Sequence, residues 1–252
     1  MAQVAALWRH PIKSHGREAL HSIALAAGMP FPWDRRWAVV HDAAADDATK
    51  GEWIPCQNFM IGTRTPGLAG IWARLDEAKG EITLRHADLG EIAFSPDDPS
   101  GQTRFLDWVM PLCPETRARP KAVVALPDRG WTDTDYPSVT LMNAASHAAV
   151  EQQIGRPLER ERWRGNIWFD GDVPFEELGW IGKRLRVGRA ILEVREPVKR
   201  CLHTAANPET GQRDADTLGA LDAGWGHRNF GIYTEVVQDG TVAVGDQLEM
   251  LT

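Results

Sequence analysis

The sequence predicts a mainly β protein with a few helices, which places it in the α+β class. Short apolar segments recur about ten residues apart, the spacing that strands have in β-barrels and sandwiches. Gly182, Gly188, Gly240 and Gly245 mark turns between such segments in the second half of the chain. Only a few stretches repeat apolar residues at helical spacing, so helices are expected to be the minority.

The first half of the chain contains six strand candidates. They are residues 2–8, 17–25, 36–41, 71–75, 81–85 and 91–94. Ser100 can cap a helix that follows them, with Phe105 and Val109 on its apolar face. The segment 114–120 has a proline at each end and breaks this pattern. We therefore expect two domains, 1–118 and 119–252, the first of them rich in β structure.

The second half contains the strongest helix signal of the chain. Asn143 can cap this helix, Gly155 can supply a left-handed stop, and Pro157 prevents its continuation. Strands are expected on both sides of the helix. The candidates are residues 122–126, 139–141, 166–169, 183–187, 190–194, 231–237 and 247–251.

Composition excludes several classes of function. The net charge is −7, from 35 acidic and 28 basic residues, which argues against a general nucleic-acid surface. No stretch approaches the roughly 18 apolar residues of a membrane span, and the first residues do not form a secretory leader. Three widely spaced cysteines do not make a disulfide framework. We expect a cytoplasmic protein that binds neither membranes nor nucleic acid.

Cys201 has the most unusual surroundings of any residue in the sequence. Lys199 and Arg200 precede it and His203 follows, and such neighbours favour a thiolate, the form that acts as nucleophile or soft metal ligand. A lone cysteine is nevertheless more often a small buried hydrophobe, so both interpretations stay open. His203 is a candidate proton donor because histidines titrate near neutrality. The other two, Cys56 and Cys113, are expected to be structural.

Basic residues also lie at three strand ends elsewhere in the chain. Lys13 stands beside Ser14, Arg35 precedes a strand, and Arg164 leads into the apolar strand that follows Asn166. Guanidinium and ammonium groups at strand ends suit a phosphate or another anionic ligand. The alternative is that each is a solvated surface cation, the usual state of such side chains.

Taken together, these motifs resemble those of the MOSC domain proteins, the molybdenum cofactor sulfurase C-terminal domain family. The similarity is closest to the branch with an N-terminal MOSC β-barrel domain, which includes the mitochondrial amidoxime reducing component and its bacterial relatives. The matching segments are 11–14 (PIKS), 34–37 (DRRW), 163–166 (WRGN), 200–201 (RC) with 207–211 (NPETG), and 240–246 (GTVAVGD).

The resemblance implies a β-barrel core that binds a molybdenum cofactor, a pterin (molybdopterin) carrying the metal. Cys201 matches the cysteine whose thiolate ligates molybdenum. The residues implied to contact the cofactor are Lys13, Ser14, Arg35, Ser138, Thr140, Arg164, Asn166, Arg200 and Tyr233. Pyridoxal phosphate binding is a further term associated with the family.

Three functions follow as hypotheses. The first is an oxidoreductase that reduces N-hydroxylated or other N-oxygenated small molecules at molybdenum held by Cys201. Because the chain has no electron-transfer centre of its own, a separate flavin or iron–sulfur protein would deliver electrons to it. The second is a sulfur carrier that holds a persulfide on Cys201 for the assembly of metal–sulfur cofactors. The third is a binding module in which this cysteine is merely buried.

Overall fold

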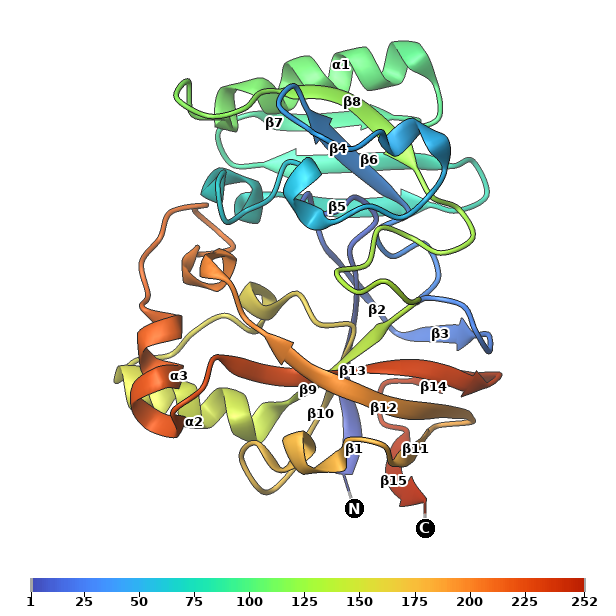
Figure 1. Cartoon of the computed structure of the whole chain (residues 1–252), viewed down its shortest axis with the longest axis vertical. Coiled ribbons are helices and arrows are strands. Elements are labelled where there is room, and N and C mark those ends of the chain that lie inside the picture. The colour runs from blue at the N-terminus through green and yellow to red at the C-terminus, as the bar shows by residue number, and fades with distance from the viewer. Residues whose placement is uncertain (1, 252) are drawn as a thin grey trace.

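The computed structural model describes residues 2–251 of the chain and has two parts, one above the other in Figure 1. The lower part is a β-barrel flanked by two helices. The upper part contains two small sheets and one helix. The mainly β fold with three α-helices confirms the predicted α+β class. No helix among the described residues is both long and apolar enough to cross a membrane.

The barrel is formed by seven strands that close on themselves. Their order is β10-β9-β13-β12-β11-β15-β1, and a further pairing of β1 with β10 completes the ring. Only the β9–β10 pair is parallel. Strand β2 (Glu18–Leu20) extends the sheet beyond β1. The barrel strands are β1 (Ala2–Arg9), β9 (Val139–Asn143), β10 (Ile167–Phe169), β11 (Arg184–Val187), β12 (Ala190–Lys199), β13 (Asn229–Gln238) and β15 (Gln247–Leu251).

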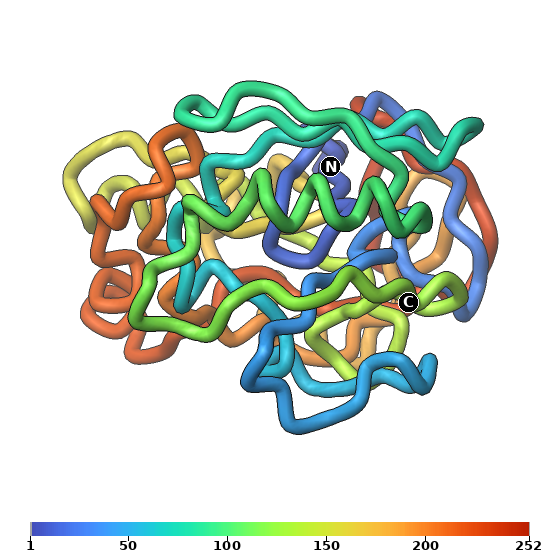
Figure 2. Tube along the Cα trace, turned by 90° about the horizontal axis from the view of Figure 1, so that it is seen from above, coloured from blue at the N-terminus to red at the C-terminus, as the bar shows by residue number. Residues whose placement is uncertain are grey.

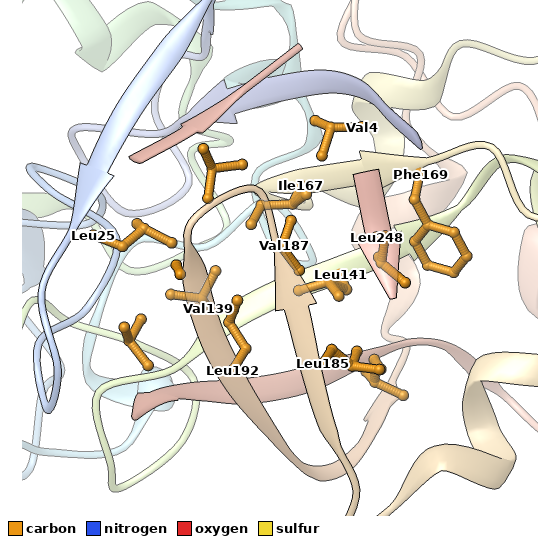
Figure 3. Packing of buried hydrophobic residues seen from close by; sticks show 14 of the residues in the cluster. Val4, Leu25, Val139, Leu141, Ile167, Phe169, Leu185, Val187, Leu192 and Leu248 are labelled. Carbon is orange, nitrogen blue, oxygen red and sulfur yellow. The ribbon is translucent and has the colours of Figure 1, made fainter. Parts of the chain in front are cut away.

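Branched aliphatic side chains fill the barrel. Figure 3 shows Val139 and Leu141 from β9 meeting Val187 from β11 and Leu192 from β12, and each of the four is fully buried. Burial alternates along β12, where Ala190, Leu192 and Val194 point inward, as expected for a strand with one face on a core. This apolar filling leaves the polar groups of the barrel to gather at its rim.

The upper part contains a ribbon and a three-stranded sheet. The ribbon pairs β4 (Trp37–His41) with β8 (Pro120–Ala125). The sheet consists of β5 (Trp72–Asp76), β6 (Glu81–His86) and β7 (Gly90–Phe94). Helix α1 (Pro99–Val109) lies at the end farthest from the barrel, as Figure 1 shows, and runs alongside β8 in Figure 2. Its inward residue Phe105 stacks on Phe94 at 4.7 Å between ring centroids.

The remaining elements connect and cover these sheets. Helices α2 (Ala144–Ile154) and α3 (Thr217–Trp225) pack on each other beside the barrel, and β3 (Ser22–Leu25) pairs with β14 (Gly240–Ala243). Short 3-10 turns complete the chain. They are η1 (Ala48–Lys50), η2 (Cys56–Asn58), η3 (Pro66–Gly70), η4 (Met110–Leu112), η5 (Arg160–Trp163), η6 (Glu176–Trp180) and η7 (Leu202–Ala205).

The structure departs from the predicted elements in several places. The cap of α1 is Asp98, which accepts from the Gly101 amide at 2.8 Å, and not Ser100. The strand expected at 17–25 is interrupted at His21 and becomes β2 and β3. Strand β12 continues five residues beyond the predicted end at 194, and α3 and β14 had no predicted counterpart. Sheet pairing also crosses the expected boundary at residue 118, because β1 belongs to the barrel while β8 pairs with β4.

The cap of α2 provides a test of how the fold is stabilised. Asn143 is fully buried, accepts from the Ala145 amide at 2.9 Å, and donates to the buried Glu177 carboxylate at 3.0 Å. Asn143→Ala should lower the free energy of unfolding by about 3 kcal/mol, because a cap and a donor to a buried charge are both lost. Urea unfolding measures this loss. The exposed Gln152→Ala on the same helix should change stability little, and equal losses would contradict the role of the cap.

Candidate functional site

A pocket of about 400 Å³ lies where the two parts of the chain meet. Lys13, Ser14 and Arg35 line it from the first part. The barrel side contributes the loop before β10, the end of β12 with the segment that follows, and one residue of β13. The predicted site residues that line the pocket are Lys13, Ser14, Arg35, Thr140, Arg164, Arg200, Cys201, His203 and Tyr233. The structure therefore brings most of the predicted residues together.

Cys201 lies two residues beyond the end of β12 and lines this pocket. Its side chain is exposed, and its Sγ accepts a hydrogen bond of 3.0 Å from Thr63 Oγ1. Two irregularities in the β12–β13 pairing, at Val194–Glu196 and Pro197–Lys199, redirect the strand just before it ends. The interpretation of Cys201 as a buried structural cysteine, and with it the hypothesis of a binding module built on one, is wrong.

Lys13 is a buried cation at the pocket wall. Its Nζ donates to the Trp131 carbonyl at 2.8 Å and forms an ion pair with Asp133. The Asp133 side chain is 48% exposed, and its partial desolvation in the pocket would raise the pKa of the carboxyl, but Lys13 and Arg35 outweigh this and lower the pKa to about 2. Asp133 is therefore ionised at neutral pH, and the pocket carries at least one carboxylate among its cations.

Arg35 and Arg164 form a second cationic group. Arg35 pairs with the buried Asp34 and donates to the Arg164 carbonyl at 3.1 Å. Arg164 Nη1 donates to the Gly16 carbonyl at 3.2 Å, while its Nη2 is buried and has no partner within the described residues. Burial and the charge of Arg35 lower the pKa of Arg164 to about 9. A buried donor without a partner costs free energy, so the Arg164 side chain is suited to an anionic ligand.

Three pocket residues have left-handed backbones although none is glycine. The φ angles are +63° at Ser14, +52° at Arg35 and +49° at Arg164. Non-glycine residues seldom adopt this region, and such conformations cluster at binding and catalytic sites, where the surrounding structure holds them. The same segments supply the pocket cations. The backbone is therefore locally strained at Ser14, Arg35 and Arg164, the positions that orient these side chains toward the pocket.

Arg200 has a different role from the other cations. Its Nη1 donates to the Trp163 carbonyl and its Nε to the Phe230 carbonyl, each at 2.8 Å. The guanidinium also lies near the rings of Trp163 and Phe230, which stack at 3.8 Å between centroids. Because the protein itself occupies these donors, Arg200 mainly fixes the backbone before Cys201.

Two of the predicted cofactor contacts lie outside the pocket lining. Asn166 is fully buried and bonds with the Thr140 hydroxyl at 2.9 Å, so it holds Thr140 in place from behind. Ser138 is buried and accepts from the Thr134 hydroxyl at 2.8 Å. Both expectations of direct contact need correction, because packing turns these polar groups toward protein partners. Tyr233 does line the pocket, and burial, followed by the charge of Asp133, raises its pKa.

His203 also reaches the pocket, but its ring is not the near-neutral proton donor expected from the sequence. Burial and the nearby charge of Arg164 lower its pKa to about 3, so the imidazole is neutral at pH 7. Gly62 packs directly on the ring, and a Cβ at this glycine would lie 1.7 Å from His203 Nδ1. The contact requires glycine at position 62 and holds the ring against the loop from the first part of the chain.

Sequence reasoning missed several pocket residues. Cys56, which was expected to be structural, is exposed and lines the pocket, whereas Cys113, with the same expectation, is buried. Thr63 and Asp133 come from loops without apolar periodicity, so no pattern singled them out. Glu196 lies on β12 at the pocket wall and accepts from the Tyr136 hydroxyl at 2.8 Å. Their positions depend on how the two parts meet.

The turn at 207–211 holds the Cys201 segment against the first part of the chain. Asn207 Oδ1 accepts from the Glu209 amide at 2.8 Å, which closes the turn. Gly211 has a φ of +68°, and a Cβ there would lie 2.7 Å from Gly67 Cα. The buried Arg17 spans the contact, donating to the Pro208 carbonyl at 2.8 Å and to the Ala69 carbonyl at 2.7 Å.

Fold and pocket define a class of two-part β proteins with an exposed thiol in a cation-lined cavity between the parts. Family models match nearly the whole chain. The MOSC N-terminal beta barrel domain matches residues 1–109, and the MOSC domain matches residues 132–249. The chain therefore belongs to the MOSC domain proteins that carry an N-terminal MOSC β-barrel domain, as its motifs indicated.

Part of this chain is similar in sequence to part of two longer curated proteins. It is 34% identical over 131 residues to the molybdenum cofactor sulfurase of Drosophila grimshawi, a match that covers 46% of this chain and 17% of the relative. The molybdenum cofactor sulfurase of Drosophila mojavensis is 31% identical over 133 residues, with 49% and 17% covered. The chain thus spans about a sixth of the length of these relatives.

Two solved structures are also similar. The YuaD protein from Bacillus subtilis has a TM-score of 0.49 and 13% sequence identity, covering 99% of this chain and 94% of that one. YiiM from Geobacillus stearothermophilus has a TM-score of 0.36 and 20% identity, with 45% and 54% covered.

Proposed function

We propose that the pocket binds a molybdenum cofactor through the Cys201 thiolate and that the chain is an oxidoreductase of N-hydroxylated or other N-oxygenated small molecules. The observation that carries the proposal is the convergence of Lys13, Arg35 and Arg164 around an exposed cysteine. Soft thiolate ligands suit a metal that is already held by sulfur. Cations and one unpartnered guanidinium donor suit the phosphate and polar ring of a pterin.

Each residue would have a definite part in holding this group. Cys201 would supply the protein ligand, and Thr63 would orient its sulfur through the 3.0 Å hydrogen bond. Arg164 Nη2 would donate to an anionic oxygen, which would satisfy its buried donor. Lys13 and Arg35 would add charge, while their pairing with Asp133 and Asp34 fixes their positions. Thr140 would offer a hydroxyl that Asn166 holds in place.

The bound cofactor would supply two-electron oxygen transfer, and the protein would supply binding, orientation and protons. Tyr233 keeps its phenolic proton at neutral pH, since a phenol ordinarily has a pKa of about 10 and burial raises that of Tyr233 further, so it can donate a hydrogen bond to a substrate oxygen. The pocket volume of about 400 Å³ lies within the range of small-molecule sites. A separate flavin or iron–sulfur protein would deliver the electrons.

Metal and pterin analysis tests the ligand role of Cys201. Wild-type protein purified from a host that makes the cofactor should contain molybdenum, and Cys201→Ala should contain at least about tenfold less, since even indirect partners of metal ligands are worth about 10–100-fold in affinity. Cys113→Ala is the matched control and should retain the metal. Equal molybdenum in wild type and Cys201→Ala would refute the proposal.

A sulfur carrier is the second candidate. The exposed Cys201 thiol could hold a persulfide for the assembly of a metal–sulfur cofactor, and the name molybdenum cofactor sulfurase borne by the Drosophila relatives supports this class. The intact mass of freshly purified protein separates the two candidates. A sulfur adduct on Cys201 without pterin favours the carrier, whereas molybdenum with pterin favours the oxidoreductase.

A further inference from the structure

A second thiol shares the pocket with Cys201. Cys56 begins the turn η2, is exposed, and lines the same cavity. Although the side chain is exposed, partial desolvation within the cavity, and then the charge of Asp133, raise the pKa of the Cys56 thiol, while Lys13 opposes the increase. Both thiols thus border the same cavity. The third cysteine, Cys113, is buried away from it.

The two cysteines belong to different parts of the chain, and the loop that follows Cys56 makes contact with Cys201. This loop continues to Thr63, whose hydroxyl reaches Cys201 Sγ at 3.0 Å. Neither cysteine lies within a strand, since Cys56 begins one 3-10 turn and Cys201 precedes another. A disulfide requires the two Cβ atoms to come within about 4.5 Å of each other, and loops can make such an adjustment without breaking the barrel.

We propose that Cys56 is the resolving thiol for a persulfide on Cys201. The Cys56 sulfur attacks the inner sulfur of the Cys201 persulfide, and a Cys56–Cys201 disulfide forms as the bond to the outer sulfur breaks. The outer sulfur leaves as hydrosulfide, which takes up the proton that Cys56 loses. No oxidant is consumed, because the persulfide already carries oxidised sulfur. The inference rests on the sulfur-carrier function.

The charges of the pocket fit this division of roles. Lys13 lines the same cavity, opposes the net rise in the pKa of the Cys56 thiol, and would stabilise the thiolate as it forms, the form that attacks a sulfur–sulfur bond. Arg35 and Arg164 line the cavity into which an anionic hydrosulfide would leave. An acceptor bound in the same pocket would therefore meet the released sulfur before it escapes to solvent.

Limited persulfidation tests the proposal directly. Wild type, Cys56→Ser, Cys201→Ser and the buried control Cys113→Ser are treated without oxygen with one equivalent of sodium polysulfide and then desalted. Released sulfide is followed with time, and peptide mass spectrometry locates the persulfide and any linked cysteines. Wild type and Cys113→Ser should release sulfide and form a Cys56–Cys201 disulfide that dithiothreitol reverses. Cys56→Ser should keep the persulfide on Cys201 and release sulfide about tenfold more slowly.

The other outcomes are separable. The resolving role would be overturned, and the carrier function would stand, if wild type kept a stable persulfide on Cys201. In that case wild type would release sulfide no faster than Cys56→Ser and would form no peptide linked through Cys56 and Cys201. If Cys201 takes up no sulfur in any of the proteins that contain this cysteine, the carrier function and this inference are both overturned. Both cysteines are exposed, so serine at either position should leave the fold intact, and urea unfolding checks this.

Discussion

Lowering the pH from about 7.5 to about 5 is expected to reduce the free energy of unfolding by at least about 4 kcal/mol. The buried His10 and His15 contribute about 2 kcal/mol each, and the buried His203, whose pKa is also lowered to about 3, adds to this loss. The pKa of His10 falls from 6.5 to about 3 and that of His15 to about 4, in both cases mainly because burial disfavours the charged ring. Between these values and 6.5 the unfolded chain binds more protons than the folded one. Stability is therefore complete above pH 6.5 and is lost as the pH falls.

The surroundings of the two rings explain the size of this effect. His10 lies 1% exposed beside Asp34, with Nδ1 at 3.1 Å from the carboxylate, while Arg164 and Arg35 oppose its protonation. His15 is fully buried, with Nδ1 at 2.7 Å from the Lys13 carbonyl and Nε2 without a partner in the described chain. A proton added at His15 would thus create a buried charge with a single hydrogen bond.

Urea unfolding at the two pH values measures this dependence. His15→Gln cannot titrate and can still donate to the Lys13 carbonyl, so its loss of stability between the two pH values should be about 2 kcal/mol smaller than that of wild type. The exposed His21→Gln is the matched control and should behave like wild type. An unchanged pH dependence in His15→Gln would mean that other groups, rather than this ring, cause the loss of stability in acid.

The strands and the strongest helix could be predicted because local patterns determine them. Helix α2 is capped by Asn143 and stopped by Gly155, at φ +84°, as its sequence indicated. Helix α3 contains Gly219 and Gly224, residues with low helix propensity. It forms because Asp216 caps it, accepting from the Gly219 amide at 2.9 Å, and because it packs on α2. Tertiary packing of this kind leaves no local signal.

Pocket residues could be predicted where their residue types are unusual for their place in the sequence. They could not be predicted where tertiary packing determines which way a side chain points. Cys201, Lys13 and Arg164 could be identified because, although each residue alone is weak evidence, their segments together resemble the motifs of one family. The role of Asn166 was misassigned, because its motif matches a binding element but its amide turns inward to Thr140. Cys56 was missed because its place in the same pocket as Cys201 depends on the contact between the two parts of the chain.

Arg17→Met is expected to lower the free energy of unfolding by about 3 kcal/mol, because three backbone carbonyls each lose a donor worth about 1 kcal/mol. Arg17 is 1% exposed and donates to the carbonyls of Ala69, Ile71 and Pro208 at 2.7, 3.1 and 2.8 Å. Its guanidinium also lies 3.9 Å from the ring centroid of Trp72. The ion pair with Glu209 adds little, since that carboxylate is 61% exposed.

The same substitution should also loosen the segment that carries Cys201. Pro208 belongs to the turn at 207–211, and Arg17 ties this turn to the 3-10 turn η3 of the first part. Without the tie, alkylation of Cys201 in the native state should accelerate relative to wild type. Arg74→Met, an exposed arginine on the neighbouring strand β5, is the matched control for both measurements. Arg17→Met and Arg74→Met could instead have the same free energy of unfolding and the same rate of Cys201 alkylation. The turn would then be held by the packing of Gly211 on Gly67, and Arg17 would be dispensable.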